Sequence, residues 1–272
     1  MGRPIFGADS RLDTDTVLSN IAAETGFPLD NLSDDREFTT FKPSTSATLE
    51  IRTDAGVGNT VDVDYFMAIG HDFNTQGASL VFASSPDDAV YTTIFSSTPG
   101  DDRVVVRTFT KVTRRFFRLT ISGQSAAPSI GQLNWGVRVE PPFFALPSDF
   151  DPLMETARFR SGRSQSGNIL GSVIGFVGRR ANIRLELQPF TFVGGTTLGD
   201  FQEFWDNHAV AGKAFLWWWN QNDPTDPDPD PTFEKDAFWV VIDNDATISR
   251  RLRTQLDVGF RDIEFTVVGR KE

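Results

Sequence analysis

The segment Arg114–Gly136, RRFFRLTISGQSAAPSIGQLNWG, constrains the fold of this chain more than any other stretch. Basic and aromatic residues alternate at its start, and Leu119 and Ile121 continue an alternation that is typical of a β-strand with one buried face. Pro128 and Gly131 mark a loop of small residues, after which a second short strand ends on a tryptophan. The segment therefore predicts two strands of a β domain joined by a loop.

Short apolar runs of the same kind recur through the first half of the chain, separated by turn signals such as DAGVGN, SSPDD and STPGDD. We expect strands at residues 47–52, 60–69, 79–84, 90–95, 102–108, 114–122 and 131–139. Short strands with turns at this spacing favour an antiparallel two-sheet sandwich.

Composition agrees with a β fold and excludes several functions. The chain has 25 Phe and 2 Tyr, and rings of this kind pack well on pleated sheets. A net charge of −11 argues against a general nucleic-acid binder and against a peripheral protein of anionic membranes. We also expect no membrane insertion and no export signal, because the apolar runs are short. The chain has no cysteine, which rules out disulfides, thiolate metal sites and cysteine nucleophiles.

The run VEPPFFALPSDFDP, Val139–Pro152, predicts a linker, because adjacent prolines cannot donate to a ladder. We place a domain boundary there, giving domains 1–146 and 147–272. The second domain is expected to be β-rich with one helix, Thr197–His208, whose aromatic residues share a face at helical spacing. Its expected strands are 181–192, 215–219, 237–242, 247–256 and 260–268.

Four segments of the first domain resemble the galactose-binding-like (discoidin-like) jelly-roll module found in tail proteins of tailed bacteriophages. They are NLSDDREFTTF, VDVDYFMAIGHDF, SLVFASSPDDAVYTTIF and the opening segment with its APSIGQLNWG strand. In the second domain, DFQEFWDNHAVAGKAFLWWWN resembles an element of phage tail and baseplate proteins.

The resemblance implies a mainly β protein with an N-terminal jelly roll. It also implies a structural virion protein at the tail tip or baseplate, a distal-tail-like minor tail protein. Such a protein forms a homo-oligomeric ring, contacts other tail proteins and host-surface glycans, and assembles in the host cytoplasm. The alternatives are a carbohydrate-binding module of a surface protein, and a neck or capsid decoration protein.

Catalytic, metal-binding and cofactor residues are not expected. The two histidines, His71 and His208, lie in different predicted domains, and no carboxylates form an acid–base motif. The acidic loop DPTDPDPDP lacks the glycine and glutamate that an EF-hand requires. We therefore expect a protein that is not an enzyme.

The candidate assembly surface combines two features. Six arginines and no acid lie between Thr156 and Leu185, which indicates a docking edge for an acidic neighbour, the lining of a DNA passage, or only a solvated strand face. Three consecutive tryptophans alternate sides in a strand, so one face fills the core and the other is covered by a helix, a loop or another subunit. The assembly candidates are Arg158, Arg160, Arg163, Arg179, Arg180, Trp217, Trp218 and Trp219.

The candidate glycan surface follows from the resemblance, since discoidin-like modules use loops at one end of the sandwich. Here these loops are residues 31–41, 54–59 and 124–129. The side chains singled out are Phe38, Phe41 and Gln124.

Overall fold

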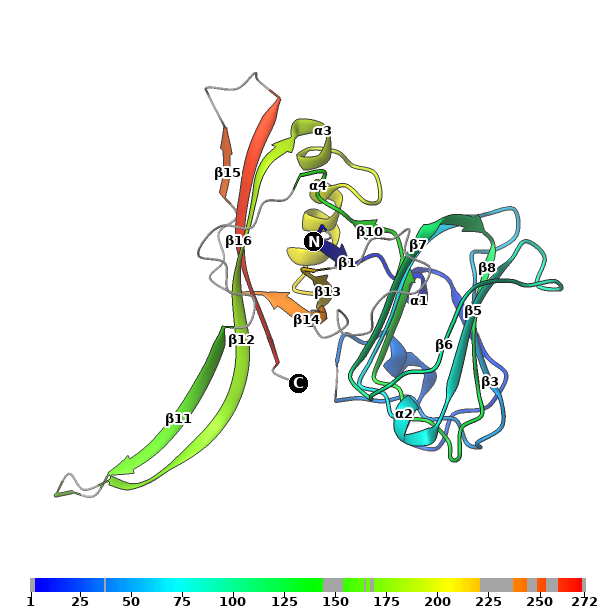
Figure 1. The fold of residues 1–272 in the computed structure, drawn as a ribbon, viewed down its shortest axis with the longest axis horizontal. Helices are drawn as coiled ribbons and strands as arrows, with labels where there is room; N and C mark the ends of the chain where they lie inside the picture. Colours follow the sequence, from blue (N-terminus) through cyan, green and yellow to red (C-terminus); the bar gives the residue numbers. More distant parts are fainter. Residues whose placement is uncertain are drawn as a thin grey trace.

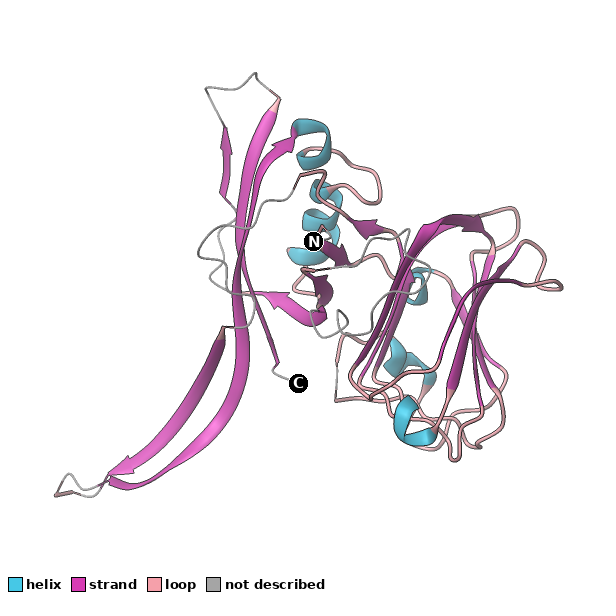
Figure 2. Cartoon of the chain, viewed as in Figure 1, coloured by secondary structure: helices cyan, strands magenta, loops and turns pink. Residues whose placement is uncertain are grey.

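A computed structural model describes residues 3–36, 38–143, 154–163, 165–166, 169–220, 237–243, 249–252 and 259–270. Strands dominate and helices are few, as Figure 2 shows. The expected fold class is confirmed: the protein is mainly β, with an N-terminal jelly-roll sandwich and a β-rich C-terminal part that carries a helical segment. Within the ranges given above, no helix is long and apolar enough to cross a membrane.

The sandwich consists of two antiparallel sheets (Figure 1). The five-stranded sheet has the order β2 (Thr16–Ser19), β3 (Leu49–Asp54), β8 (Phe116–Ser122), β5 (Ser79–Ser85) and β6 (Thr92–Ser97). The three-stranded sheet has the order β7 (Val104–Arg114), β4 (Val61–Ile69) and β9 (Gln132–Gly136). Three short helical turns flank them: α1 (Arg11–Thr14), the 3-10 turn η1 (Leu29–Leu32) and α2 (Phe73–Gln76).

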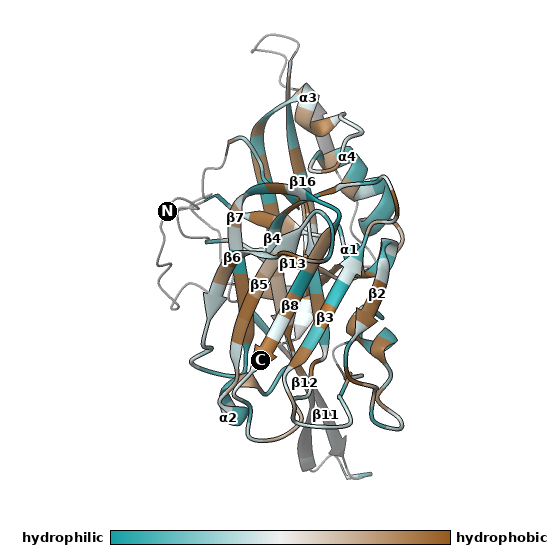
Figure 3. Ribbon diagram, turned by 90° about the vertical axis from the view of Figure 1, so that its right-hand side faces the viewer, coloured by the Kyte–Doolittle hydropathy of each residue, from teal (hydrophilic) through white to brown (hydrophobic). Residues whose placement is uncertain are grey.

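Alternation along the strands fills the sandwich core, as expected from the opening segment. In β8, Phe117, Leu119 and Ile121 are fully buried, while the residues between them are partly exposed. The same alternation is visible along β3 and β8 in Figure 3. At the centre, the ring of Trp135 lies 5.3 Å from that of Phe82, and its indole nitrogen donates a hydrogen bond of 3.2 Å to Thr53.

The third sheet, which has eight strands, draws them from both ends of the sequence. Its order is β10 (Arg138–Val139), β1 (Ile5–Gly7), β13 (Phe215–Trp218), β14 (Ala237–Ile242), β16 (Phe260–Arg270), β12 (Ile169–Pro189) and β11 (Glu155–Arg163), with β15 (Ser249–Leu252) also paired to β16. Two of these strands, β1 and β10, belong to the predicted domain 1–146. The division into 1–146 and 147–272 therefore does not separate the sheets, although Leu146 itself lies outside the described residues.

The helical segment differs in detail from the expected helix over Thr197–His208. The segment α3 (Phe190–Val193) is helical where a strand was expected, because Pro189 has no N–H to continue the ladder of β12. The main helix begins at α4 (Phe201–Phe204) and continues as a π-helical turn, η2 (Trp205–Ala209). Asp200 precedes it, and its carboxylate accepts hydrogen bonds from the main-chain N–H and the hydroxyl of Thr197.

Two further apolar cores surround the eight-stranded sheet. On one face, α4 and η2 cover the sheet, and the ring of Phe204 lies 5.6 Å from Phe6 and 5.0 Å from Phe215. On the other face, Leu216 and Trp218 pack in one cluster with Tyr65 and Met67 of the sandwich strand β4. The sandwich and the C-terminal sheet are thus joined by a shared buried layer (Figure 1).

The longest strand, β12, runs well beyond this packed body. Its residues 169–179 pair with β11, and its residues 178–189 pair with β16. The distal part is consequently a two-stranded hairpin that projects from the protein, drawn in light green in Figure 1. We call this hairpin, Glu155–Arg163 with Ile169–Val177, the arm.

Candidate binding and assembly surfaces

The arm carries three of the five arginines predicted to mediate assembly. Arg158, Arg160 and Arg163 are all on β11, where the register pairs Arg158 with Phe176 and Arg160 with Val173. Irregularities in the pairing follow Arg158 and Gly162, so the hairpin is not a uniform ladder. The structure thus places these three cations on the projecting element.

The other two predicted arginines lie at the base of the arm and interact within the chain. The guanidinium of Arg179 lies 4.4 Å from the ring centroid of Phe238 on β14. Arg180 forms an ion pair of 2.9 Å with Asp243. Their contacts join the arm to the C-terminal sheet, which is a structural role that the sequence pattern did not distinguish from docking.

The structure corrects the prediction that the three consecutive tryptophans form an assembly surface. Trp217 lies in the core beneath α4, whereas Trp218 lies in the layer against the sandwich, so the predicted alternation of faces is right. Both indoles are buried inside the chain and cannot anchor a neighbouring subunit. Trp219 is half-buried and packs against the helical core. The sequence did not determine what covers the strand face that carries Trp218, and in the structure the sandwich of the same chain covers it.

The loops predicted to form one glycan-facing end lie at opposite ends of the sandwich. Phe41 pairs with Ile130, which brings the loops 31–41 and 124–129 together. The ladder between β3 and β8 sets Asp54 opposite Phe116 and Leu49 opposite Ile121. Because β3 and β8 run in opposite directions, the loop 54–59 that follows β3 lies at the end where β8 begins, and the loop 124–129 that follows β8 lies at the other end.

Of the three side chains proposed to face a glycan, one is exposed. Phe38 is 81% exposed, whereas Phe41 is fully buried. Gln124 is also buried, and its amide donates a hydrogen bond of 2.7 Å to the main-chain oxygen of Ala47. The assignments of Phe41 and Gln124 to a glycan surface are thus wrong, because both residues close the sandwich.

The loop that presents Phe38 is held in place by polar contacts. The side-chain amide of Gln132 lies 3.1 Å from the main-chain oxygen of Asn31 and 2.9 Å from a carboxylate oxygen of Asp34. Thr39 donates to the same carboxylate at 2.6 Å. A fixed, exposed ring beside polar groups can stack on an apolar face of a ligand.

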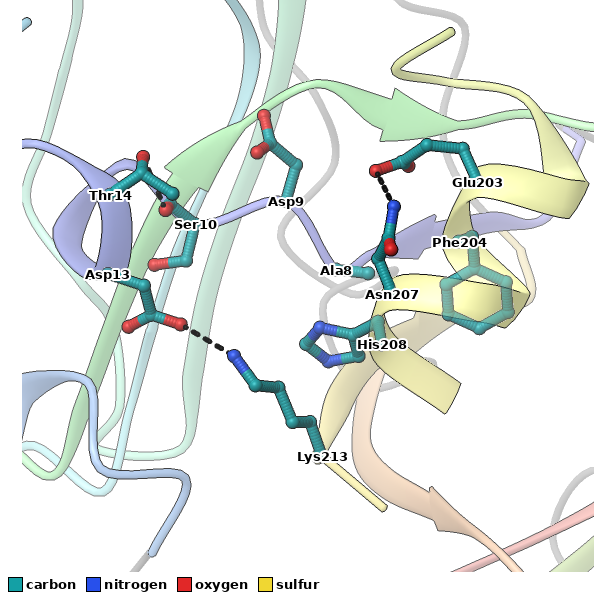
Figure 4. A pocket seen from close by; sticks show the side chains of 10 residues that line it. All are labelled: Ala8, Asp9, Ser10, Asp13, Thr14, Glu203, Phe204, Asn207, His208 and Lys213. Atoms are coloured by element: carbon teal, nitrogen blue, oxygen red, sulfur yellow. Dashed lines mark hydrogen bonds and ion pairs between the residues drawn. The ribbon is translucent and has the colours of Figure 1, made fainter. Parts of the chain in front are cut away.

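Acidic side chains gather where α1 approaches η1 and η2. Asp13, Asp34 and Asp35 interact electrostatically, and burial together with these like charges raises the pKa of Asp35 to about 6. Asp30 is exposed in η1, the turn that precedes Asp34 and Asp35 in the chain. We call Asp13, Asp30, Asp34 and Asp35 the acidic patch; Lys213 forms an ion pair of 3.5 Å with Asp13 (Figure 4).

A cavity of about 140 Å³ lies next to the acidic patch, between α1 and η2. Its lining includes Asp9, Glu203 and His208, and Figure 4 shows Asn207 hydrogen-bonded to Glu203 along the same helical segment, on one side of the cavity. Pockets for organic ligands span about 300–1,000 Å³, so this one has room only for water or a small ion. A sugar ring does not fit in it.

Both histidines have structural roles. His71 is buried, its ring stacks 4.3 Å from that of Phe73, and burial lowers its pKa to about 4. His208 lies 2.6 Å from the main-chain oxygen of Ala214, and burial lowers its pKa. Among the residues whose placement the structure describes, no three His, Asp or Glu side chains come together as a metal site would require.

No family model and no curated protein matches the chain. Solved structures do match part of it. Chitosan-binding module 1 of a chitosanase/glucanase from Paenibacillus sp. IK-5 is 17% identical, covering 47% of this chain and 98% of its own with a TM-score of 0.40. A putative alpha-L-fucosidase from Bacteroides thetaiotaomicron is also 17% identical, covering 47% of this chain and 28% of its own with a TM-score of 0.39.

A third solved structure is CpGH89CBM32-5 from Clostridium perfringens, in complex with GalNAc-beta-1,3-galactose. It is 12% identical and covers 47% of this chain and 99% of its own, with a TM-score of 0.39. At such identities and scores, no ligand or activity transfers from these proteins to this chain.

Proposed function

We propose that this chain is a structural subunit that assembles through its arm and holds a jelly-roll module rigidly on the assembly. The observation that carries the proposal is the arm itself. A two-stranded hairpin is marginally stable in water on its own, and this one extends beyond the packed cores. A neighbouring subunit would supply the missing contacts.

Rigid attachment of the jelly roll supports the same function. β1 and β10 come from the two ends of the sandwich sequence and both pair into the C-terminal sheet. The layer around Tyr65 and Trp218 then buries one face of the sandwich. A module fixed in this way moves with the part that carries the arm, which suits an ordered assembly better than a tethered binding domain.

The finer proposal, which rests on the resemblance of the four sequence segments, is a ring-forming tail-tip or baseplate component of a tailed bacteriophage, located in the virion tail. Light scattering and negative-stain electron microscopy of the full chain should show one defined oligomer with a closed outline. A chain that stays monomeric at all concentrations and binds no purified tail protein would overturn the proposal.

Glycan binding by the sandwich is the second candidate function, and the exposed ring of Phe38 favours it. On an array of immobilised glycans the chain should bind a defined subset, and Phe38→Ala should weaken that binding at least tenfold. Val57→Ala is the matched control, because Val57 is 87% exposed in the loop at the opposite end of the sandwich. Equal binding by wild type and Phe38→Ala would remove Phe38 from any glycan site.

A further inference from the structure

The charge of the arm is opposite to that of the rest of the protein. The whole chain has a net charge of −11, yet the arm contains three arginines and one acid, Glu155, and the longer span of residues 156–185 contains six arginines and no acid. Two of the six, Arg180 and Arg184, form ion pairs near the base with Asp243 and Glu186. The arginines of β11 extend this cationic segment away from the body.

The backbone of the arm is also open to further pairing. In the sheet order of the described strands, β11 is the terminal strand, and β16 pairs with β12 only from Gly178 onward. Both edges of the hairpin therefore present main-chain groups that another surface can cover. Arginine supplies planar, multidentate donors that suit carboxylate partners.

The acidic patch has complementary chemistry on another side of the molecule. Asp13 and Asp30 are exposed, and Asp34 and Asp35 are partly exposed. Like charges crowded together are costly, and an incoming cation relieves that cost. The patch lies on α1, on η1 and on the residues that follow η1, and not on the arm, so one copy can offer its arm while it receives another.

We propose that the arm of one copy docks on the acidic patch of a second copy of this chain, an inference that deepens the proposed function and rests on it. The contact is heterologous, since two different surfaces meet. Repetition of such a contact gives a closed ring or an open filament. Opposite charges at the contact also speed association and make it sensitive to salt.

The test uses charge reversal in the full chain. Replacement of the three arm cations by Arg158→Glu, Arg160→Glu and Arg163→Glu should weaken self-association at least tenfold in sedimentation experiments at low salt. Asp13→Lys with Asp30→Lys should do the same, while leaving the loop contacts of Asp34 intact. A chain that combines both sets restores opposite charges and should regain the oligomer.

A matched control has the same change in net charge away from both surfaces. Arg103→Glu, Lys111→Glu and Arg114→Glu alter three exposed cations in or next to β7. This variant should assemble like wild type, and circular dichroism should confirm that every variant folds.

Each outcome bears on a distinct claim. If the arm variant assembles like wild type, docking of the arm through its charges on the acidic patch is overturned, while the proposed assembly through the arm survives in a form that uses its main-chain edges. If both single sets dissociate but the combined chain does not reassemble, the acidic patch is not the receiving surface. If wild type is monomeric and instead binds DNA through the arm, both proposals fail.

Discussion

The hydroxyl of Tyr65 donates a hydrogen bond of 2.6 Å to the main-chain oxygen of Asp9. Tyr65 is a fully buried residue of the sandwich strand β4, and Asp9 lies between β1 and α1. The bond thus fastens the N-terminal segment, which pairs into the C-terminal sheet, to the jelly roll.

Tyr65→Phe removes this bond and retains the ring. We expect the free energy of unfolding to fall by about 1–2 kcal/mol, because the partner oxygen loses its donor. Urea titration followed by tryptophan fluorescence measures the change. Phe38→Leu, at an exposed position, serves as the control and should stay within about 0.5 kcal/mol of wild type.

Gly136→Ala should destabilise the protein strongly. Gly136 lies opposite Tyr65 in the ladder, and a Cβ there would collide with the main-chain oxygen of Asp9. Because that oxygen belongs to backbone, relief requires movement of the chain, at a cost of about 1–3 kcal/mol or more. Thermal unfolding measures it, and Gly100→Ala is the control, since nothing lies within 4 Å of its added Cβ. Equal melting temperatures would contradict the prediction.

His71 should make the fold sensitive to acid. Burial lowers its pKa from 6.5 to about 4 in the folded protein, so the unfolded chain binds a proton first as the pH falls. The free energy of unfolding contains the full contribution of neutral His71 above pH 6.5 and loses it progressively as the pH falls from about 6.5 to 4. This lowers the free energy of unfolding by about 3 kcal/mol, because each pKa unit of difference between the folded and unfolded states corresponds to roughly 1.4 kcal/mol. His71→Gln should be less stable at pH 7 and show a shallower decline in urea titrations across that range. An unchanged slope would show that His71 does not titrate as stated.

Asp35→Asn should stabilise the protein at neutral pH. The folded-state pKa of Asp35 is raised from 3.8 to about 6, so its ionisation costs stability as the pH rises through that range. Its φ of 61° is left-handed backbone, which Asn tolerates. Since the side chain is partly exposed, we expect a gain of about 1 kcal/mol above pH 6 that disappears below about pH 4.

The matched position for Asp35 is Asp88, whose φ is 65°. Its carboxylate accepts hydrogen bonds from Arg52 and Tyr91, so Asp88→Asn should lower stability where Asp35→Asn raises it. Denaturant titrations of both variants at pH 7 and pH 4 test this contrast. Similar signs at pH 7 would mean that the backbone, and not the charge, decides the effect.

Local patterns of apolar residues predicted much of the fold and part of the candidate surfaces. Alternation in Phe117–Ile121 indicated a half-buried strand, and the aromatic spacing around Phe201 indicated a helix that lies where expected but begins later. The concentration of arginine between Thr156 and Leu185 indicated the segment that forms the arm and its base. By contrast, Phe41 and Gln124 have side chains that suit either a loop surface or a sandwich edge.

The sequence by itself determined the β class, the alternation of buried faces in strands such as β8, and the charge contrast between the arm and the rest. Only the tertiary structure decided what each face packs against. Three residues, Ile5–Gly7, are too few to show a period, yet they pair with β10 and β13 at the junction of both parts. Periodicity reports which side of a strand avoids water, whereas the partner on that side depends on contacts between residues far apart in the chain. That is why Trp218 meets the sandwich of its own chain and not a neighbouring subunit.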